Sequence, residues 1–209
     1  MDMKRRWIGL CARLGLGAHA GETWKMIEGS YAERHRRYHT LRHIEYCLKL
    51  FDQYRYLASN DLAVEYALWL HDLVYRTHWQ PKGLPSNEDL SAVSADDFLA
   101  LSTLSTKRLR EEVSGLIRAT THRPGTVNTD DEKLVADIDW SSIGCSWKDF
   151  EQNGRDIRFE YGPVSDEDFR HGREKFFSEA LRRQSQFYLP AFREKYEKQA
   201  VVNLKRALD

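Results

Sequence analysis

Proline, cysteine and the alternating apolar–polar pattern of β-strands are all scarce in this sequence. Only 5 prolines occur in 209 residues, and four of them stand in stretches that read as loops, so long helices are left uninterrupted. Helical periodicity dominates, which predicts an all-α fold. The cysteines form no Cys-x-x-Cys pair, so neither a disulfide framework nor a thiolate zinc site is expected and a reducing cytoplasm is favoured. They are Cys11, Cys47 and Cys145.

A net charge of either sign is also absent. Lys plus Arg and Asp plus Glu are both 32, and without a continuous basic stripe we do not expect a nucleic-acid binder. No apolar run approaches the ~18 residues of a membrane span, so no membrane partner is expected. The basic residues 4–6 precede an apolar stretch as in a secretory signal, but Arg13 interrupts it. A first amphipathic helix in a cytoplasmic protein is the favoured interpretation.

Helical segments follow one another along the whole chain. The length suits a single domain, and no linker or repeat divides it. Residues 76–86 contain a glycine and two prolines, which predicts a loop that could act as a lid or contact a substrate. Apolar periodicity and capping residues predict helices over residues 3–16, 22–33, 38–57, 61–75, 88–101, 106–122, 129–143, 147–161, 165–184 and 190–208.

Two strongly polar side chains, His71 and Asp72, interrupt the most apolar of the predicted helices. Burying an imidazole and a carboxylate without partners is costly, and a divalent cation would satisfy both. His39 and His43 stand four residues apart and would share one face of the helix predicted over 38–57. Further along the chain, a capping box at Thr129 and Glu132 opens a helix that carries two more aspartates.

The order His…His-Asp…Asp on a helical scaffold resembles the HD superfamily of metal-dependent phosphohydrolases. Three segments carry the resemblance: Arg37–Leu41, Ala67–Asp72 and Leu134–Asp137. The chain as a whole is similar to a bacterial branch described only as predicted HD-type phosphohydrolases, including Asn87-Glu88 with Ser91-Ala92 and the segment Ile157–Tyr161. The resemblance implies one HD-type domain over residues 1–209, with a metal-binding core at roughly 30–145 and a helical C-terminal extension at 146–209.

By the same resemblance, the metal ligands map onto His39, His71, Asp72 and Asp137. A ligand set of nitrogen and oxygen favours Mn, Fe, Co, Ni or Zn and leaves positions open for water. The implied reaction is the attack of metal-bound water on the phosphorus of a small phosphorylated molecule such as a nucleotide. Asp72 and Glu88 are the candidate catalytic residues.

Several nearby residues keep more than one interpretation. His43 is a ligand, a hydrogen-bond donor to a ligand, or a solvated helix residue. His122 holds a second metal or serves as a C-terminal histidine favoured by the helix dipole. Asp137 and Asp139 point about 200° apart on a helix, so both are not expected to bind one ion; Asp139 orients a ligand or is an ordinary helix charge. Glu88 is an acid/base group or a first-turn carboxylate. The remaining candidates, for phosphate binding, are Arg36 and Arg42.

Three functions follow from this pattern. The leading prediction is a metal-dependent phosphohydrolase. Some HD-fold proteins look like di-iron oxygenases, which use additional histidines to hold two irons, and His43 and His122 keep that alternative open. The third is a non-catalytic module that senses or binds a nucleotide, in which the metal stabilises the fold or the bound nucleotide regulates a partner.

Overall fold

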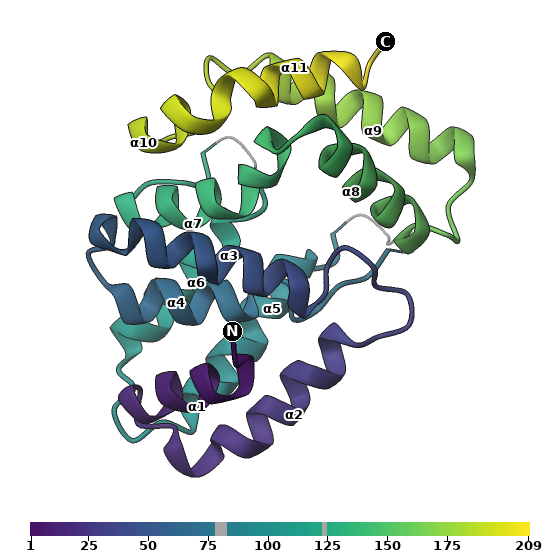
Figure 1. The fold of residues 1–209 in the computed structure, drawn as a ribbon. Helices are drawn as coiled ribbons and strands as arrows, with labels where there is room; N and C mark the ends of the chain where they lie inside the picture. Colours follow the sequence, from purple (N-terminus) through teal and green to yellow (C-terminus); the bar gives the residue numbers. More distant parts are fainter. Residues whose placement is uncertain (78–82, 123–124) are drawn as a thin grey trace.

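The most apolar stretch of the sequence forms the central helix, α4 (Asp61–Leu70), whose residues from Ala63 to Leu70 are all buried. We analysed a computed structural model that describes residues 1–77, 83–122 and 125–209. Within these ranges the regular structure is entirely helical, which confirms the predicted all-α fold. Helices that precede and follow α4 in the chain pack against it (Figure 1). An amphipathic helix buries one stripe, whereas α4 is apolar over most of its surface and is buried on every side, with its one buried charge, Glu65, paired with Arg6 and Arg55.

The N-terminal helices cover one side of α4. They are α1 (Met3–Arg13) and α2 (Ala20–Tyr31), joined through the short 3₁₀ turn η1 (Gly17–His19). Trp7 of α1 stacks on Tyr66 with ring centroids 5.7 Å apart and meets Trp69 edge-on at 5.5 Å. The hydroxyl of Tyr31, at the end of α2, donates to the backbone carbonyl of Trp69 at 2.9 Å. Aromatic packing thus anchors this pair of helices to the core.

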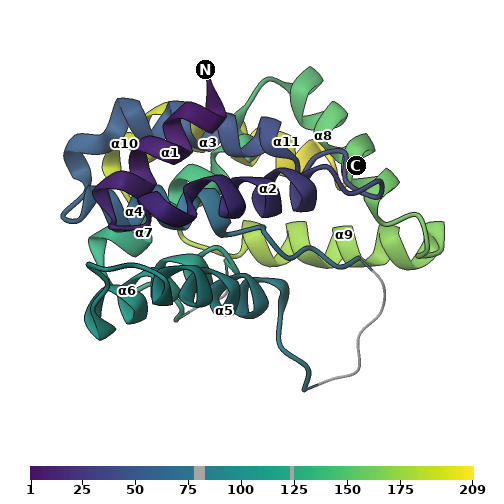
Figure 2. The ribbon, with the colours of Figure 1, turned by 90° about the horizontal axis from the view of Figure 1, so that it is seen from below.

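Four further helices pack against α4 and complete the core. They are α3 (Leu41–Tyr54), α5 (Asn87–Ala100), α6 (Lys107–Ala119) and α7 (Asp130–Trp140). Short 3₁₀ turns follow two of them, η2 (Arg55–Leu57) after α3 and η3 (Ser141–Gly144) after α7. Figure 2 shows α5 and α6 side by side. The predicted capping box at the start of α7 is present.

The C-terminal helices form a layer on one side of this core (Figure 1). The Asn203 side chain fixes the last of them by donating to the carbonyls of Ile143 and Cys145 at 2.8 and 2.9 Å. In chain order the layer comprises α8 (Trp147–Glu160), α9 (Asp166–Leu181), α10 (Pro190–Phe192), a π-helical turn η4 (Arg193–Glu197) and α11 (Lys198–Arg206).

Several helices are shorter than the sequence predicts, and in two of them the difference affects candidate site residues. The helix expected over 38–57 begins only at Leu41, because the Thr40 side chain caps it, so His39 precedes the helix. The helix expected over 61–75 ends at Leu70, and His71 is its C-terminal cap. Both differences move candidate site residues off regular helix. Part of the loop predicted over 76–86, residues 78–82, lies outside the described residues.

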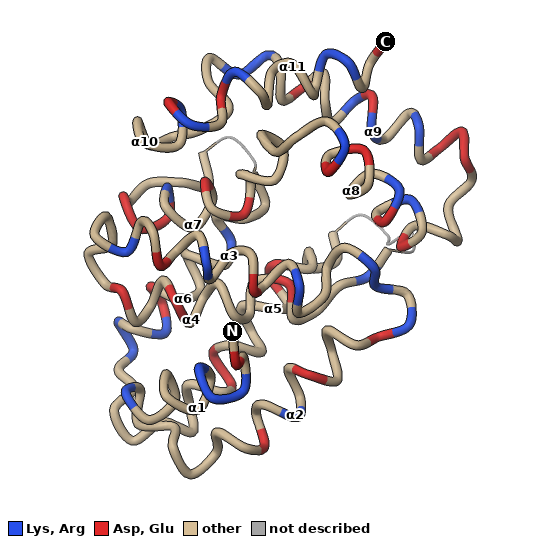
Figure 3. The backbone as a smooth tube through the Cα atoms, in the orientation of Figure 1, with Lys and Arg blue, Asp and Glu red and all other residues tan. Residues whose placement is uncertain are grey.

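Charged residues of both signs are interspersed along the backbone in the view of Figure 3. In the described part of the chain, helices with the length and apolar character of a membrane span are absent.

Candidate metal centre

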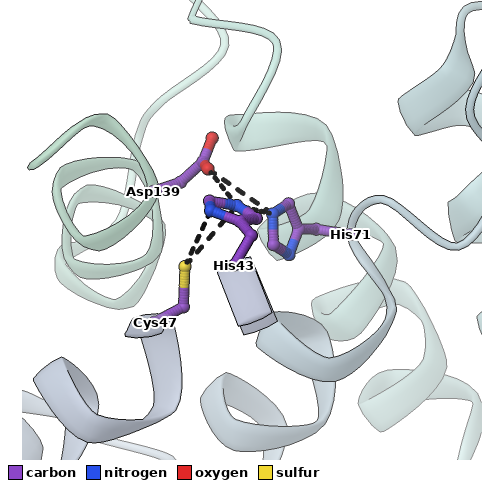
Figure 4. A group of neighbouring side chains, drawn as sticks. All are labelled: His43, Cys47, His71 and Asp139. Carbon is purple, nitrogen blue, oxygen red and sulfur yellow. Dashed lines mark hydrogen bonds and ion pairs between the residues drawn. The ribbon is translucent and has the colours of Figure 1, made fainter. Parts of the chain in front are cut away.

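Imidazole and carboxylate groups from three elements converge at one place in the core. His43 comes from the first turn of α3, His71 and Asp72 from the turn that ends α4, and Asp139 from α7. Figure 4 shows His43, His71 and Asp139 pointing toward one another, with Cys47 beside them. His43 and His71 are buried, whereas the Asp72 and Asp139 side chains keep 13 % and 16 % of their surface exposed. The cluster is therefore enclosed on one side and open on the other.

The spacing of these groups is compatible with a shared metal ion. The Nε2 atoms of His43 and His71 lie 3.2 Å apart. Asp139 Oδ1 lies 3.1 Å from the Nε2 of His43 and 3.4 Å from that of His71. Asp72 Oδ2 lies 3.6 and 3.1 Å from the same two atoms. Nitrogen and oxygen ligands about 2.0 Å from one ion in a tetrahedral shell lie roughly 3.3 Å from one another, which is close to these distances.

The backbone holds the His71 ring in the tautomer that a metal requires. Its Nδ1 lies 3.1 Å from the carbonyl of Leu68, an acceptor that only a protonated nitrogen can satisfy. In the neutral ring, the lone pair of Nε2 is then directed into the cluster. Histidine ligands of metals are typically oriented by such a hydrogen bond on the other ring nitrogen.

Without a cation, the cluster behaves as a buried ion network. Burial acts to lower the pKa of His71, but the neighbouring Asp72 and Asp139 outweigh it and raise that pKa well above its usual range. Burial acts in the opposite sense on Asp139, yet hydrogen bonds from His122, His43 and His71 hold its pKa well below the usual range. Protons therefore occupy the position that a divalent ion would take, and a metal must displace them.

Cys47 belongs to the same group of potential ligands, which the sequence analysis did not anticipate. Its Sγ lies 3.6 Å from His43 Nε2. Burial raises the pKa of the Cys47 thiol well above its usual range, and the charges of Asp139 and Asp72 add to the rise. The sequence did hold a signal, because positions 43 and 47 share a helix face. The absence of a Cys-x-x-Cys pair obscured it.

His122 contacts the cluster from outside. Its Nε2 lies 2.8 Å from Asp139 Oδ2, the carboxylate oxygen that does not face His43 and His71. The residue has a φ of 52°, in the left-handed region that histidine tolerates better than most side chains. The contact adds a role that the sequence analysis did not consider, which is to orient the Asp139 carboxylate. It also leaves open the predicted role of holding a second ion, which would lie beside that carboxylate.

His39 lies beside the cluster but is engaged elsewhere. Its Nδ1 lies 2.7 Å from Glu160 Oε2, and its ring stacks on Tyr75 at 3.9 Å between centroids. Glu160 also accepts the backbone N–H groups of residues 37–39. The structure thus does not bring His39 into the four-atom group. The expectation that His39 and His43 share a helix face is wrong, because α3 begins after His39.

Asp137, the aspartate implied by the family resemblance, faces away from the cluster. Its carboxylate accepts the backbone N–H of Tyr188 at 2.8 Å and that of Leu189 at 2.7 Å. Burial raises the pKa of Asp137 to about 7, against the opposing effect of these two amides. Asp137 joins α7 to the start of α10. The geometric argument that the two aspartates face apart holds, and it is Asp139 that faces the histidines.

The two candidate phosphate-binding arginines lie outside the cavity beside the cluster. Arg36 is buried and its guanidinium donates to the carbonyls of Asp72 at 2.6 Å and Leu73 at 2.8 Å, so it fixes the turn after α4. Arg42 is exposed. Glu88, in the first turn of α5, does line the cavity.

The open side of the cluster faces a cavity of about 500 Å³. Asp72, Asp139, His39 and His122 line it at the cluster end. Pockets for single small ligands have volumes of roughly 300–1,000 Å³. The arrangement therefore combines a site that fits a metal ion with space for a small molecule beside it.

Comparison of the chain with protein-family models, curated proteins and solved structures gave no significant match in any of the three. The resemblance to the HD superfamily stays a prediction. What the structure establishes is an all-α fold with a buried His, Cys and Asp cluster that fits a metal ion.

Proposed function

We propose that the protein is a metal-dependent phosphohydrolase of the HD type that acts on a small phosphorylated molecule. The observation that carries the proposal is the convergence of His43, His71, Asp72 and Asp139 beside a cavity of about 500 Å³. His43 and Asp139 take the places that the resemblance gave to His39 and Asp137. The order His…His-Asp…Asp along the chain is unchanged by this exchange.

Each group has a separate role in the proposal. His43, His71 and Asp139 would hold the ion, and Asp72, on the cavity side, would hold it and accept a hydrogen bond from water or substrate. When bound, a divalent Mn, Fe, Co, Ni or Zn ion would stabilise charge on a phosphoryl group and acidify a water molecule. Glu88 lines the same cavity and stays a candidate for accepting a proton.

The test combines metal analysis with an activity screen. The purified chain should contain a transition metal and release phosphate from one member of a panel of small phosphate esters. His71→Ala and Asp72→Ala should remove metal and activity together. Arg42→Ala changes an exposed residue of α3 outside the cavity and should leave both unchanged. A His71→Ala chain that keeps its metal would contradict the ligand assignment.

His122 supports a second candidate, a di-iron oxygenase of the same fold. Its Nε2 lies against the outer oxygen of Asp139, where a second ion would share that carboxylate. The measured stoichiometry decides between the two functions. Two irons per chain with oxygen consumption would favour the oxygenase, whereas one metal per chain would rule it out. If no phosphate ester is hydrolysed but a nucleotide raises the melting temperature of the protein, the result would favour a non-catalytic binding module.

A further inference from the structure

The cavity beside the cluster has a second wall, built by the C-terminal helices. Tyr161, Phe169 and Phe176 of this layer line it. Phe176 keeps 38 % of its surface exposed, although it also meets Trp140 edge-on with ring centroids 5.3 Å apart. Tyr161 and Phe169 are half-buried and contact each other, so the exposed ring of Phe176 is the one best placed to pack against a flat ring of a ligand in a cavity of this size.

Arg173 of α9 is the only Lys or Arg among the described residues that line the cavity. Its guanidinium carbon lies 4.3 Å from the ring centroid of Phe177, which holds the side chain over that ring. Within residues 1–77, 83–122 and 125–209 it forms neither an ion pair nor a hydrogen bond. Asp168 lines the same cavity from the same helix, but its carboxylate accepts a hydrogen bond from the Ser165 hydroxyl at 2.7 Å.

The surroundings of Arg173 connect it to the cluster. Burial lowers the pKa of Arg173, which is the mark of a charge that has lost hydration without gaining a carboxylate. Tyr38 and Tyr75 lie within electrostatic range of it. Tyr75 stacks on His39, and the ring of Tyr38 lies 5.1 Å from that of His43. Tyr38 therefore lies near both the guanidinium and His43, one of the proposed ligands.

We propose that Arg173 is a specificity-determining residue, which binds the phosphate of an organic phosphate ester while the ester's flat aromatic ring packs on the wall formed by α8 and α9. A guanidinium presents two parallel N–H donors to the oxygens of a phosphate. The inference rests on the proposed function in taking this cavity as the substrate cavity. Because Asp72 and Asp139 line it too, the anion should bind only when a cation offsets their charge.

Calorimetric titration of the Mn²⁺-loaded chain with three probes distinguishes the contribution of the phosphate group to binding from that of the aromatic ring. The probes are adenosine, methylphosphonate, and an analogue of AMP in which a C–P bond replaces the ester and prevents hydrolysis. We expect the AMP analogue to bind at least about tenfold more tightly than either other probe. Arg173→Gln should weaken its binding about tenfold or more and leave adenosine unchanged. The affinity of the Arg173→Lys chain for the analogue should lie between those of the wild-type and Arg173→Gln chains, because lysine keeps the positive charge but lacks the two parallel N–H donors.

Arg170→Gln is the matched control, since it removes an exposed guanidinium from the same helix. It should bind all three probes as the wild-type chain does. Near-UV circular dichroism and Mn content establish that each variant is folded and loaded. Equal affinity of the AMP analogue for the Arg173→Gln and wild-type chains overturns the inference, as does no binding of the analogue to the wild-type chain. Failure of the proposed function looks different: the wild-type chain then retains no metal or releases no phosphate.

Discussion

Asp137 and Asp139 have opposite roles although a single residue separates them. The Asp139 carboxylate meets two imidazoles of the cluster, whereas the Asp137 carboxylate meets two backbone amides of the segment that leads into α10. Successive positions on a helix are about 100° apart, so these two side chains leave α7 on nearly opposite faces. The pair therefore allows the proposed metal ligand, Asp139, to be tested against a nearby aspartate that binds backbone amides instead.

We expect Asp139→Asn to abolish metal binding and Asp137→Asn to preserve it. The Asp137→Asn chain should instead lose about 1–3 kcal/mol of unfolding free energy, because the amide NH₂ would replace one of the two oxygens that accept the N–H groups of Tyr188 and Leu189. Elemental analysis gives the metal content, and urea denaturation gives the stability. The assignment fails if Asp137→Asn is the variant that loses its metal.

At the scale of single elements, the end of α4 is held by Arg36. Its guanidinium donates to the carbonyls of Asp72 and Leu73 and also bonds Glu33 at 2.9 Å. Carbonyls at a helix C-terminus lack partners within the helix, so a buried cation satisfies them here. The orientation of Asp72 in the cluster depends on this turn.

We expect Arg36→Met to lower the unfolding free energy by about 2–4 kcal/mol, since it leaves two buried carbonyls without donors. Arg42→Met, on exposed surface, should change it by no more than ~0.5 kcal/mol. Urea denaturation measures the unfolding free energy of both variants and of the wild-type chain. Equal stabilities would show that Arg36 does not support the turn.

Glu160, at the end of α8, fixes the segment that precedes α3. The buried carboxylate accepts three backbone N–H groups and pairs with His39. Burial acts to raise the pKa of Glu160, but the bonds from His39 and the backbone outweigh it and lower that pKa. The ionised form is therefore the one that the folded state stabilises.

A lowered pKa gives a definite pH dependence. The stability from Glu160 is fully present above its unfolded-state pKa of about 4.3 and is lost as pH falls through the lower folded-state value. At pH 7 we expect Glu160→Gln to cost about 2–4 kcal/mol, and the difference from wild type should shrink below pH 4. Glu151→Gln, on the exposed side of the same helix, should show neither effect. The measurement is urea denaturation across pH 3–7; a difference that grows toward acid would contradict this role.

At the scale of the whole molecule, metal binding should be linked to stability. The proposed ligands come from α3, α7 and the turn after α4, so a bound ion would tie together elements far apart in sequence. An ion that binds only the folded state stabilises it by about 2.7 kcal/mol at a concentration of 100 times Kd.

Removing the metal with a chelator should therefore lower the melting temperature by roughly 5–10 °C, at about 2–4 °C per kcal/mol for a chain of this size. Restoring the metal should recover it. The Asp139→Asn chain serves as the control, because its melting temperature should not respond to either treatment. Differential scanning calorimetry measures the shift, and an equal response of both chains would argue against the site.

By itself, the sequence determined the helical architecture, the central position of α4 and the presence of His71 and Asp72 at its end. These features depend on local periodicity and capping, which neighbouring residues encode. Only the tertiary structure decided that His43 rather than His39, and Asp139 rather than Asp137, meet that pair. The choice depends on where α3 begins and on which face of α7 the C-terminal layer occupies. Thr40 caps α3 locally, but the segment before it is held by Glu160, and Asp137 is held by the amides of residues 188 and 189. These partners lie more than 50 positions away in the chain, so no local pattern records their effect.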